Sequence, residues 1–278
     1  MALQNSLAKQ QPKFSVAIQG DGYKKLINNT LGDPSRAQRF IASVSSAVAV
    51  NPQLQECDAG TILSGALLGE ALNLSPSPQL GQYYLVPFND SNRGGKVATF
   101  QLGYKGYIQL AIRSGYYKKI NVLALKTGEL IHFDPMEEVI EAKLIEDEVE
   151  RESAETTGYY AMFEYQNGFK KAIYWSRQKM ESHALQYSKG YKAKKGYTFW
   201  EKDFDAMALK TMLRQLISKW GIMSTELQRA VESDMAVIHQ DKQPEYVDNV
   251  DFTETPAPTA EEPAPPEPPA EPEIDPFA

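Results

Sequence analysis

The residues around Gly103 and Gly106 have the types and spacing that suit the binding of a nucleic acid. The two glycines flank Tyr104 and Lys105 at a point where a strand pattern gives way to a helix pattern. Glycine lets a backbone approach a ligand closely, and the N–H groups that open a helix attract phosphate oxygens. A lysine adds a mobile positive charge, and a tyrosine ring is a flat face for base stacking. These features favour a single strand over a closed duplex.

The charge around this segment is unusual for a chain whose formal net charge is −7. Residues 91–128 hold seven basic residues and no acidic residue. Residues 166–220 hold twelve basic and four acidic residues, whereas residues 134–155 hold ten acidic and two basic residues. Because residues 245–278 carry ten acidic residues and no basic one, residues 1–244 have a net charge of +3. The stretch from Arg93 to Lys126 is therefore a basic surface that the whole-chain charge conceals, and it favours an anionic partner.

A second basic, tyrosine-containing cluster spans residues 188–197. We interpret it as a loop that closes over a bound strand. The alternatives are an exposed loop without a ligand and, in both stretches, tyrosines that only pack in the core. The candidate DNA contacts are Arg93, Lys96, Thr99, Gln101, Tyr104, Lys105, Arg113, Lys118, Lys119, Lys189, Tyr191, Lys192, Lys194, Lys195, Tyr197, Lys202, Lys210 and Arg214.

The hydrophobic periodicity predicts an α+β fold, with helices first, then a mostly antiparallel sheet, then helices again. Asp33 and Asp58 are predicted to begin two helices, and Gln166-Asn167-Gly168 predicts a hairpin turn. Helices are predicted near residues 34–50, 59–71, 104–114, 176–187, 204–220 and 225–237. Strands are predicted near residues 82–88, 96–102, 119–125, 129–132, 139–144, 159–165 and 170–175.

Several kinds of site are disfavoured by the sequence. The nearest match to an ATP phosphate loop has Asp90 in place of the first glycine and Val97 in place of the Ser or Thr. One cysteine and three scattered histidines do not make a zinc site, so we expect no metal or other cofactor. The polar N-terminus lacks a signal peptide and no apolar run spans a membrane, so we expect a cytoplasmic protein with no membrane partner.

Two other kinds of nucleic-acid protein remain as alternatives. Asp134, Glu141 and Lys143 have the residue types of a Mg²⁺-dependent nuclease, although ten acidic residues in one segment make chance matches common. The segment from Gly103 to Gly106 also fits the Gly-x-x-Gly loop of a KH module. That loop joins two helices in KH modules, whereas a strand is predicted before it here.

Three segments together resemble the RecT family of phage single-strand annealing proteins. They are residues 103–115, with Leu110-Ala111 and Arg113-Ser114-Gly115 after the glycines; residues 74–87; and residues 206–220, which end at Lys219-Trp220. The resemblance covers roughly residues 15–240 in the same order. It implies a non-enzymatic protein that binds single-stranded DNA, oligomerises into rings or helical filaments, and anneals complementary strands without ATP in homologous recombination. The same resemblance designates Gln101, Tyr104, Lys105 and Arg113 as DNA contacts.

The resemblance also implies partners: single-stranded DNA, the annealed duplex, further copies of the chain and a phage 5′→3′ exonuclease. We divide the chain into an annealing domain, residues 1–244, and a disordered Pro- and Glu-rich acidic tail, residues 245–278, because the tail composition cannot bury enough apolar surface to fold. The tail ends Glu273-Ile274-Asp275-Pro276-Phe277-Ala278, which resembles the acidic Pro-Phe tip of bacterial single-strand-binding proteins except for the extra Ala278. It either competes with DNA, docks on the partners of the host single-strand-binding protein, or only increases solubility. The host single-strand-binding protein is itself a further candidate partner.

Overall fold

The computed structural model describes residues 12–90, 95–196, 198–239 and 245–246. Its helices and antiparallel sheets confirm the predicted α+β class. Arg93, Tyr197 and residues 247–278 of the predicted tail lie outside the described residues. None of the described helices combines the length and the apolar character needed to cross a membrane.

Helices form the first part of the chain, and their starts follow from capping residues. Asp33 accepts hydrogen bonds from the backbone N–H groups of Ser35 and Arg36, and Asp58 accepts one from Thr61. Such bonds satisfy N–H groups that have no partner within the helix, so both predicted starts are confirmed. The elements are α1 (Phe14–Ala17), α2 (Asp21–Leu31), α3 (Pro34–Val50), the 3₁₀ helix η1 (Pro52–Glu56) and α4 (Ala59–Ala71).

The first sheet follows α4 and is built on the predicted hairpin. Strands β1 (Tyr83–Asp90) and β2 (Gly95–Leu102) pair antiparallel, with Tyr83 opposite Leu102. The short strands β8 (Ala236–Val237) and β9 (Glu245–Tyr246) complete the order β1-β2-β8-β9. The first core contains buried residues of α3, α4 and this sheet, and it extends into the next helix, α5 (Tyr104–Arg113).

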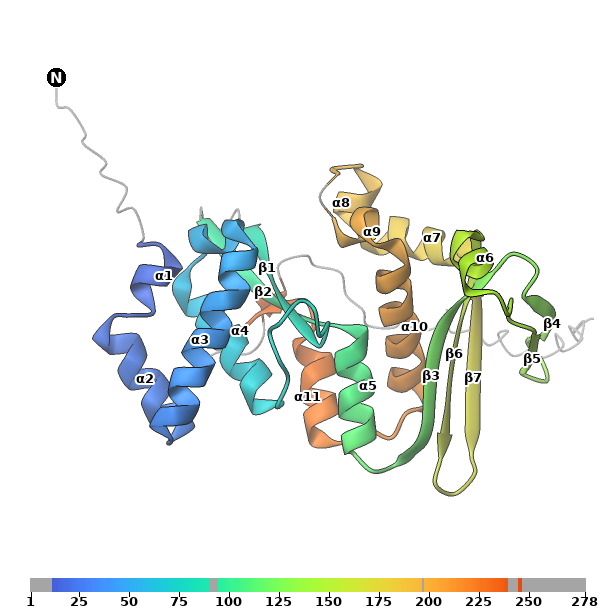
Figure 1. Ribbon diagram of the computed structural model, residues 1–278, viewed down its shortest axis with the longest axis horizontal. Coiled ribbons are helices and arrows are strands. Elements are labelled where there is room, and N and C mark those ends of the chain that lie inside the picture. Colours follow the sequence, from blue (N-terminus) through green and yellow to red (C-terminus); the bar gives the residue numbers. More distant parts are fainter. Residues whose placement is uncertain (1–11, 91–94, 197, 240–244, 247–278) are drawn as a thin grey trace, which may run out of the picture. The chain divides into compact units, whose positions relative to one another are not determined.

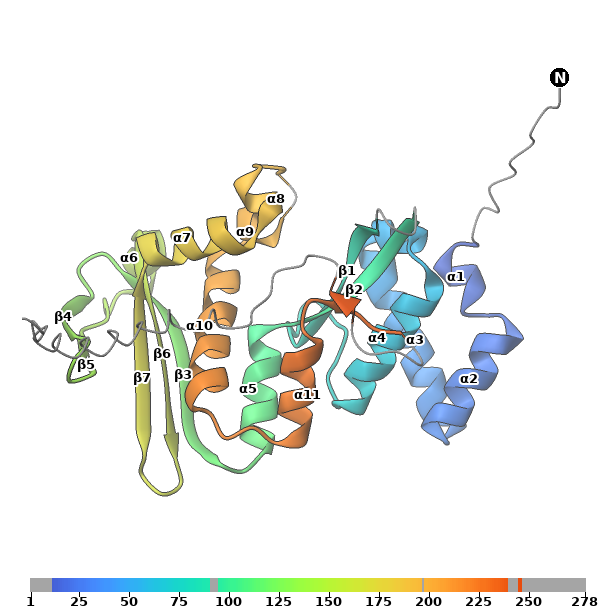
Figure 2. The ribbon, with the colours of Figure 1, turned by 180° about the vertical axis from the view of Figure 1, so that it is seen from behind.

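The second sheet has the order β3-β6-β7, from β3 (Tyr117–Lys126), β6 (Thr156–Tyr165) and β7 (Lys170–Ser176). The predicted turn is confirmed between β6 and β7, where Gly168 has the positive φ of +87° that such a turn needs. The long helix α10 (Phe204–Trp220) packs between this sheet and α5, as Figures 1 and 2 show. Alternate residues of β6 point toward α10 and α7 (Arg177–Tyr187) and form a second core.

Several regions differ from the sequence prediction, among them α1 and α2, which precede the first predicted helix. Residues 188–203 contain two short helices, α8 (Lys189–Lys192) and α9 (Phe199–Lys202), where an open loop was predicted. The last helix, α11 (Thr225–Ser233), is shorter than predicted because the chain turns at Asp234 and Met235 and continues as β8, which pairs with β2.

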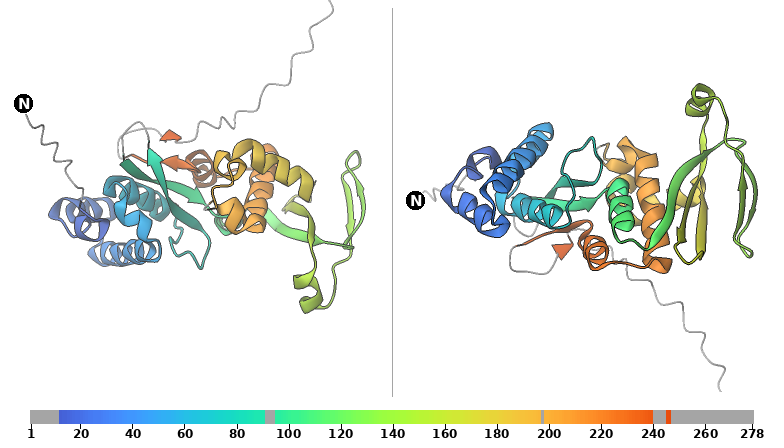
Figure 3. Two further views of the ribbon diagram at one scale, coloured as in Figure 1. Left: turned by 90° about the horizontal axis from the view of Figure 1, so that it is seen from above. Right: turned by 60° about the horizontal axis from the view of Figure 1, so that its bottom comes forward.

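A separate two-stranded hairpin follows β3. Strands β4 (Leu130–Asp134) and β5 (Val139–Ala142) pair antiparallel, and the short helix α6 (Glu148–Ser153) follows them. Figure 3 shows this hairpin beside the second sheet and on the opposite side of it from α10. We refer to residues 130–142 as the arm.

Candidate nucleic-acid interface

The junction between β2 and α5 holds the glycines that the sequence analysis singled out. Gly103 is the N-cap of α5, and its N–H group donates a 2.8 Å hydrogen bond to the carbonyl of Gln82. A Cβ atom at Gly103 would lie 2.1 Å from the Gly81 carbonyl oxygen, and one at Gly106 would lie 2.1 Å from that of Gln82. The glycines are thus required because the chain entering β1 crosses the start of α5. The close approach that we had assigned to a ligand is made by the protein's own backbone.

Lys105 and two tyrosines lie together at this crossing. A Cβ atom at Gly81, where φ is +61°, would be 3.1 Å from the Tyr84 hydroxyl and 3.4 Å from Cδ of Lys105. Lys105 is exposed, and its Nζ atom lies 6.0 Å from the ring centroid of Tyr104. Within the described part of the chain, no acidic group forms an ion pair with Lys105. The junction therefore presents a cation beside two half-buried aromatic rings.

Residues 188–203, which we call the α8–α9 segment, contact this junction. The rings of Tyr84 and Phe199 are 6.0 Å apart between centroids. Burial raises the pKa of Tyr84, with further contributions from Tyr104 and Asp203, so these three residues share one environment. The structure thus places Phe199 of the α8–α9 segment against Tyr84 of β1, beside Lys105 of the first basic stretch.

The α8–α9 segment is ordered by its own caps and by an aromatic cluster. The Ser188 hydroxyl accepts a hydrogen bond from the Tyr191 N–H group, and Thr198 with Glu201 forms a reciprocal capping box. The ring of Tyr191 lies 6.2 Å from that of Trp200 and 6.1 Å from that of Phe204. Tyr191 is therefore engaged in packing. The exposed members of the predicted set in this segment are Lys189, Lys192, Lys194, Lys195 and Lys202.

Several predicted contacts in the first basic stretch have partners within the fold. Lys96 pairs with Glu56, and Lys118 pairs with Glu164 at 2.7 Å. The guanidinium of Arg113 donates to the carbonyls of Leu72 (2.7 Å) and Asn73 (3.2 Å), which satisfies backbone acceptors just past the end of α4. The remaining three are buried Thr99, which donates to the Val86 carbonyl; half-buried Gln101, which donates to Thr99; and exposed Lys119.

Lys210 and Arg214 occupy a different environment from the one expected. Their charged ends lie 2.9 Å and 3.2 Å from the two carboxylate oxygens of Asp234, which is fully buried. Burial lowers the pKa of Lys210, and the ion pair with Asp234 opposes that effect. The sequence predicts Lys210 as a DNA contact, which requires a position at the surface. Its ammonium is instead enclosed, because a carboxylate from distant sequence neutralises it in the interior.

Asp234 also connects this ion pair to the junction. Its carboxylate accepts hydrogen bonds from the Leu102 N–H group at 2.9 Å and from the Tyr107 hydroxyl at 3.3 Å. Leu102 precedes Gly103, and Tyr107 lies in the first turns of α5. The buried ion pair consequently fixes both sides of the segment from Gly103 to Gly106.

Of the residues proposed for a nuclease site, Asp134 and Glu141 lie on the arm, and Lys143 follows directly after it. Asp134 accepts hydrogen bonds from the N–H groups of Met136 (2.8 Å) and Glu137 (3.2 Å), so its carboxylate stabilises the turn of the arm. Glu141 pairs with His132 across the two strands. In the residues that the structure describes, no three His, Cys, Asp or Glu side chains are grouped so that they could hold a metal ion.

Tyr84 and Phe199 are not among the contacts predicted from the sequence. The alternation in β1 contained a usable signal, because Tyr83 and Tyr84 must point to opposite faces of the sheet. Tyr83 is buried and stacks on Phe100 with centroids 5.1 Å apart, so Tyr84 takes the other face. Phe199 gave no comparable signal, since its contact with Tyr84 depends on the tertiary fold.

Comparison with known proteins identifies the class to which this chain belongs. A model of the RecT family matches residues 38–248, and the chain belongs to that family, whose members act by single-strand annealing in phage-type DNA recombination. Two relatives are similar over most of their length. "Uncharacterized protein YqaK" of Bacillus subtilis is 39% identical over 256 residues, which cover 89% of this chain and 82% of YqaK. "Protein RecT" of Escherichia coli is 31% identical over 217 residues, which cover 77% of this chain and 75% of that protein.

Proposed function

We propose that this protein binds single-stranded DNA at the junction of β2 and α5, oligomerises on it, and anneals a complementary strand without ATP. The observation that carries the proposal is the contact between Tyr84 and Phe199, which joins the exposed Lys105 to the exposed lysines of the α8–α9 segment. Lysines supply salt-dependent attraction to phosphates, and aromatic rings stack on unpaired bases of any sequence. This combination favours a strand whose bases are free to pair with a complement.

The proposed DNA contacts form two groups. Exposed cations form the first group, and the aromatic side chains at the junction form the second. Lys210 and Arg214 are left out, since their charges are neutralised by Asp234. The cations are Lys105, Lys119, Lys189, Lys192, Lys194, Lys195 and Lys202, and the aromatic residues are Tyr84, Tyr104 and Phe199.

The proposal extends to partners and to the cell. We infer that the protein receives 3′-ended strands from a 5′→3′ exonuclease, holds the annealed duplex as its product, and acts in the cytoplasm. Residues 1–244 are proposed as the annealing domain and residues 245–278 as an acidic tail that competes with DNA for the lysines.

Incubation with two complementary labelled oligonucleotides tests the function. We expect faster duplex formation with the protein than without it, in the absence of nucleotide, and intact strands after incubation with Mg²⁺. Strands that become shorter under Mg²⁺ would instead support the nuclease of Asp134, Glu141 and Lys143. A rate equal to that of the oligonucleotides alone would contradict the proposal.

A further inference from the structure

The arm is an isolated hairpin with unusual exposure. Strands β4 and β5 pair only with each other among the described strands, so their outer edges have no strand neighbour there. A two-stranded hairpin is marginally stable by itself in water, and open edges readily pair with or dock on another chain. A hairpin of this kind persists only if its base is held firmly or if its surface is covered.

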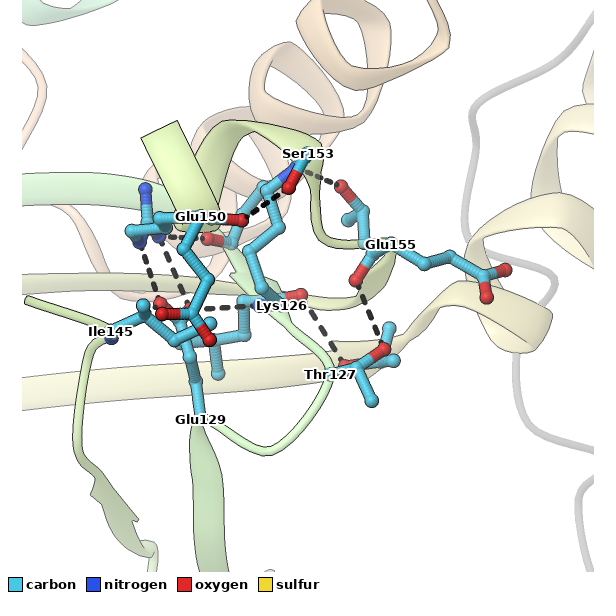
Figure 4. A network of polar contacts seen from close by, with 12 residues as sticks. Lys126, Thr127, Glu129, Ile145, Glu150, Ser153 and Glu155 are labelled. Carbon is cyan, nitrogen blue, oxygen red and sulfur yellow. Dashed lines mark hydrogen bonds and ion pairs between the residues drawn. The ribbon is translucent and has the colours of Figure 1, made fainter. Parts of the chain in front are cut away.

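The base of the arm is held by a buried carboxylate. Glu129 accepts hydrogen bonds from Arg151 Nε at 2.6 Å and from the N–H groups of Lys126 (2.8 Å) and Ile145 (3.1 Å), as Figure 4 shows. Burial opposes ionisation of Glu129, but these hydrogen bonds outweigh it and lower its pKa. Thr127 also donates to the Glu155 carbonyl, which ties the chain before the arm to the chain after it. The arm is thus anchored by ionised groups at its root.

Two further contacts attach the arm to the second sheet. The ring of Phe133 lies edge-on to that of Tyr174 with centroids 5.0 Å apart, and Glu138 pairs with Lys171. These contacts set the direction of the arm before any partner arrives. A preorganised element loses less conformational entropy on binding, so it is suited to docking.

The anchored arm leaves large apolar side chains in solvent. Met136, at its tip, is 88% exposed and Ile131 is 65% exposed, while Val139 is exposed to a smaller extent. Anchored elements that expose apolar side chains beside unpaired strand edges are typical of interaction surfaces. The exposed methionine is adaptable in shape, which suits contact with another protein.

The charge of the arm indicates which kind of surface it binds. The arm, residues 130–142, holds four acidic residues and no Lys or Arg, whereas the α8–α9 segment, residues 188–203, holds five lysines and two acidic residues. A symmetric contact between two arms would place acid against acid, whereas an arm on the basic surface of another copy is attractive. A contact between two different surfaces of identical chains is head-to-tail, and it produces rings or open filaments.

We propose that the arm docks on a second copy of this chain, against its basic surface within residues 166–220, in a head-to-tail contact. The inference rests on the assembly in the proposed function and specifies the surface that makes it. It also implies that assembly weakens with salt. The acidic arm and DNA are both attracted to basic surface. Some lysines of residues 166–220 therefore contact the arm of a neighbouring subunit, and others contact DNA.

The test replaces two exposed apolar residues of the arm by neutral polar ones, in the double variant Ile131→Ser and Met136→Ser. The matched control carries Val16→Ser and Val50→Ser, which are 64% and 66% exposed, lie in α1 and α3 outside the arm, and likewise leave the charge unchanged. Sedimentation velocity over a concentration series measures the oligomeric state with and without a single-stranded oligonucleotide. We expect the protein concentration at which half of the chains are assembled to be at least tenfold higher for the arm variant than for the wild type. The control should have the same value as the wild type.

A mixture of the arm variant and the wild type tests whether the contact is head-to-tail. The arm variant keeps the basic surface that receives an arm, so it can bind to the end of a wild-type assembly but cannot extend it. A small fraction of the variant should therefore shorten wild-type assemblies more than dilution of the wild type by the same fraction does. Equal assembly of the arm variant and the wild type would overturn the inference, as would a wild type that stays monomeric with DNA. Shortening in proportion to dilution alone would overturn the head-to-tail contact. Annealing by the wild type is measured in parallel, so that a failed arm prediction is distinguishable from a failed function.

Discussion

Two basic regions of this protein use the same residue types for opposite purposes. In α10, Lys210 and Arg214 enclose the buried carboxylate of Asp234. In the α8–α9 segment, Lys192 and Lys194 are exposed. A lysine is available to a ligand only where the fold supplies no carboxylate to it, and the carboxylate that decides this for Lys210 lies 24 residues away. Substitutions in the two regions should therefore have different consequences for stability and for DNA binding.

Removal of the charge at Lys210 should have the largest effect, and it should act on stability. Lys210→Met leaves the buried carboxylate of Asp234 with fewer partners, and breaking a buried ion pair costs about 3–5 kcal/mol. Chemical denaturation measures the free energy of unfolding of this variant and of the matched Lys192→Met. We expect Lys192→Met to remain within about 0.5 kcal/mol of the wild type. A Lys210→Met protein as stable as the wild type would remove the difference between the two regions.

Loss of the Phe199 ring should weaken DNA binding without a comparable loss of stability. Phe199 is 38% exposed and contacts Tyr84, so Phe199→Ala removes a face for base stacking worth about 1–3 kcal/mol. Phe169→Ala is the control, because Phe169 is similarly exposed at 47% but lies at the turn between β6 and β7. Fluorescence anisotropy with a labelled oligonucleotide measures both affinities. Equal losses in the two variants would show that the ring at position 199 has no special role.

Lys105→Ala should weaken binding roughly three- to tenfold and reduce the slope of log affinity against log salt by about 1, because one phosphate contact is lost. Lys25→Ala, an exposed lysine of α2, is the control. Anisotropy titrations at several salt concentrations give the slopes. An unchanged slope for Lys105→Ala would mean that this lysine does not contact a phosphate.

The smallest expected effect concerns His183, which lies between the rings of Trp175 and Tyr187. Burial and the nearby Arg214 lower the pKa of His183 to about 4. In the unfolded chain the His183 imidazole is protonated as the pH falls below about 6.5, whereas in the folded chain it stays neutral until the pH approaches 4. The free energy of unfolding therefore falls as the pH drops from about 6.5 toward 4. His183→Phe should remove roughly 1 kcal/mol of that fall at pH 5, after allowance for partial exposure. Thermal unfolding at pH 7 and pH 5 measures this, and identical pH dependence in both proteins would contradict it.

Local features of the fold could be predicted from the sequence because they depend on neighbouring residues. Asp33 caps a helix through the N–H groups of Ser35 and Arg36, and Gly168 permits the turn between β6 and β7. The basic stretches were likewise visible as charge. The end of α11 could not be predicted in this way, because Asp234, just after the helix, accepts a hydrogen bond from the N–H group of Leu102, which is 132 residues away in the chain.

The candidate site could be predicted only in part for the same reason. Lys105 was identified from its neighbours, whereas Tyr84 and Phe199 become partners only in the folded chain. The roles of Gly103 and Gly106 were also misjudged, because the backbone that approaches them, at Gly81 and Gln82, arrives from another strand. Spacing along the chain thus indicates which residues can bind DNA, but only the fold determines which remain available.

We propose that DNA lies against the junction of β2 and α5 and against the α8–α9 segment. Ultraviolet cross-linking of the full chain to a single-stranded oligonucleotide, followed by mass spectrometry of the peptides, tests it most directly. We expect cross-links at Tyr84, Tyr104 or Phe199 and in the peptides that hold residues 188–203. Cross-links confined to the arm, or to the helices before Gly81, would contradict the account.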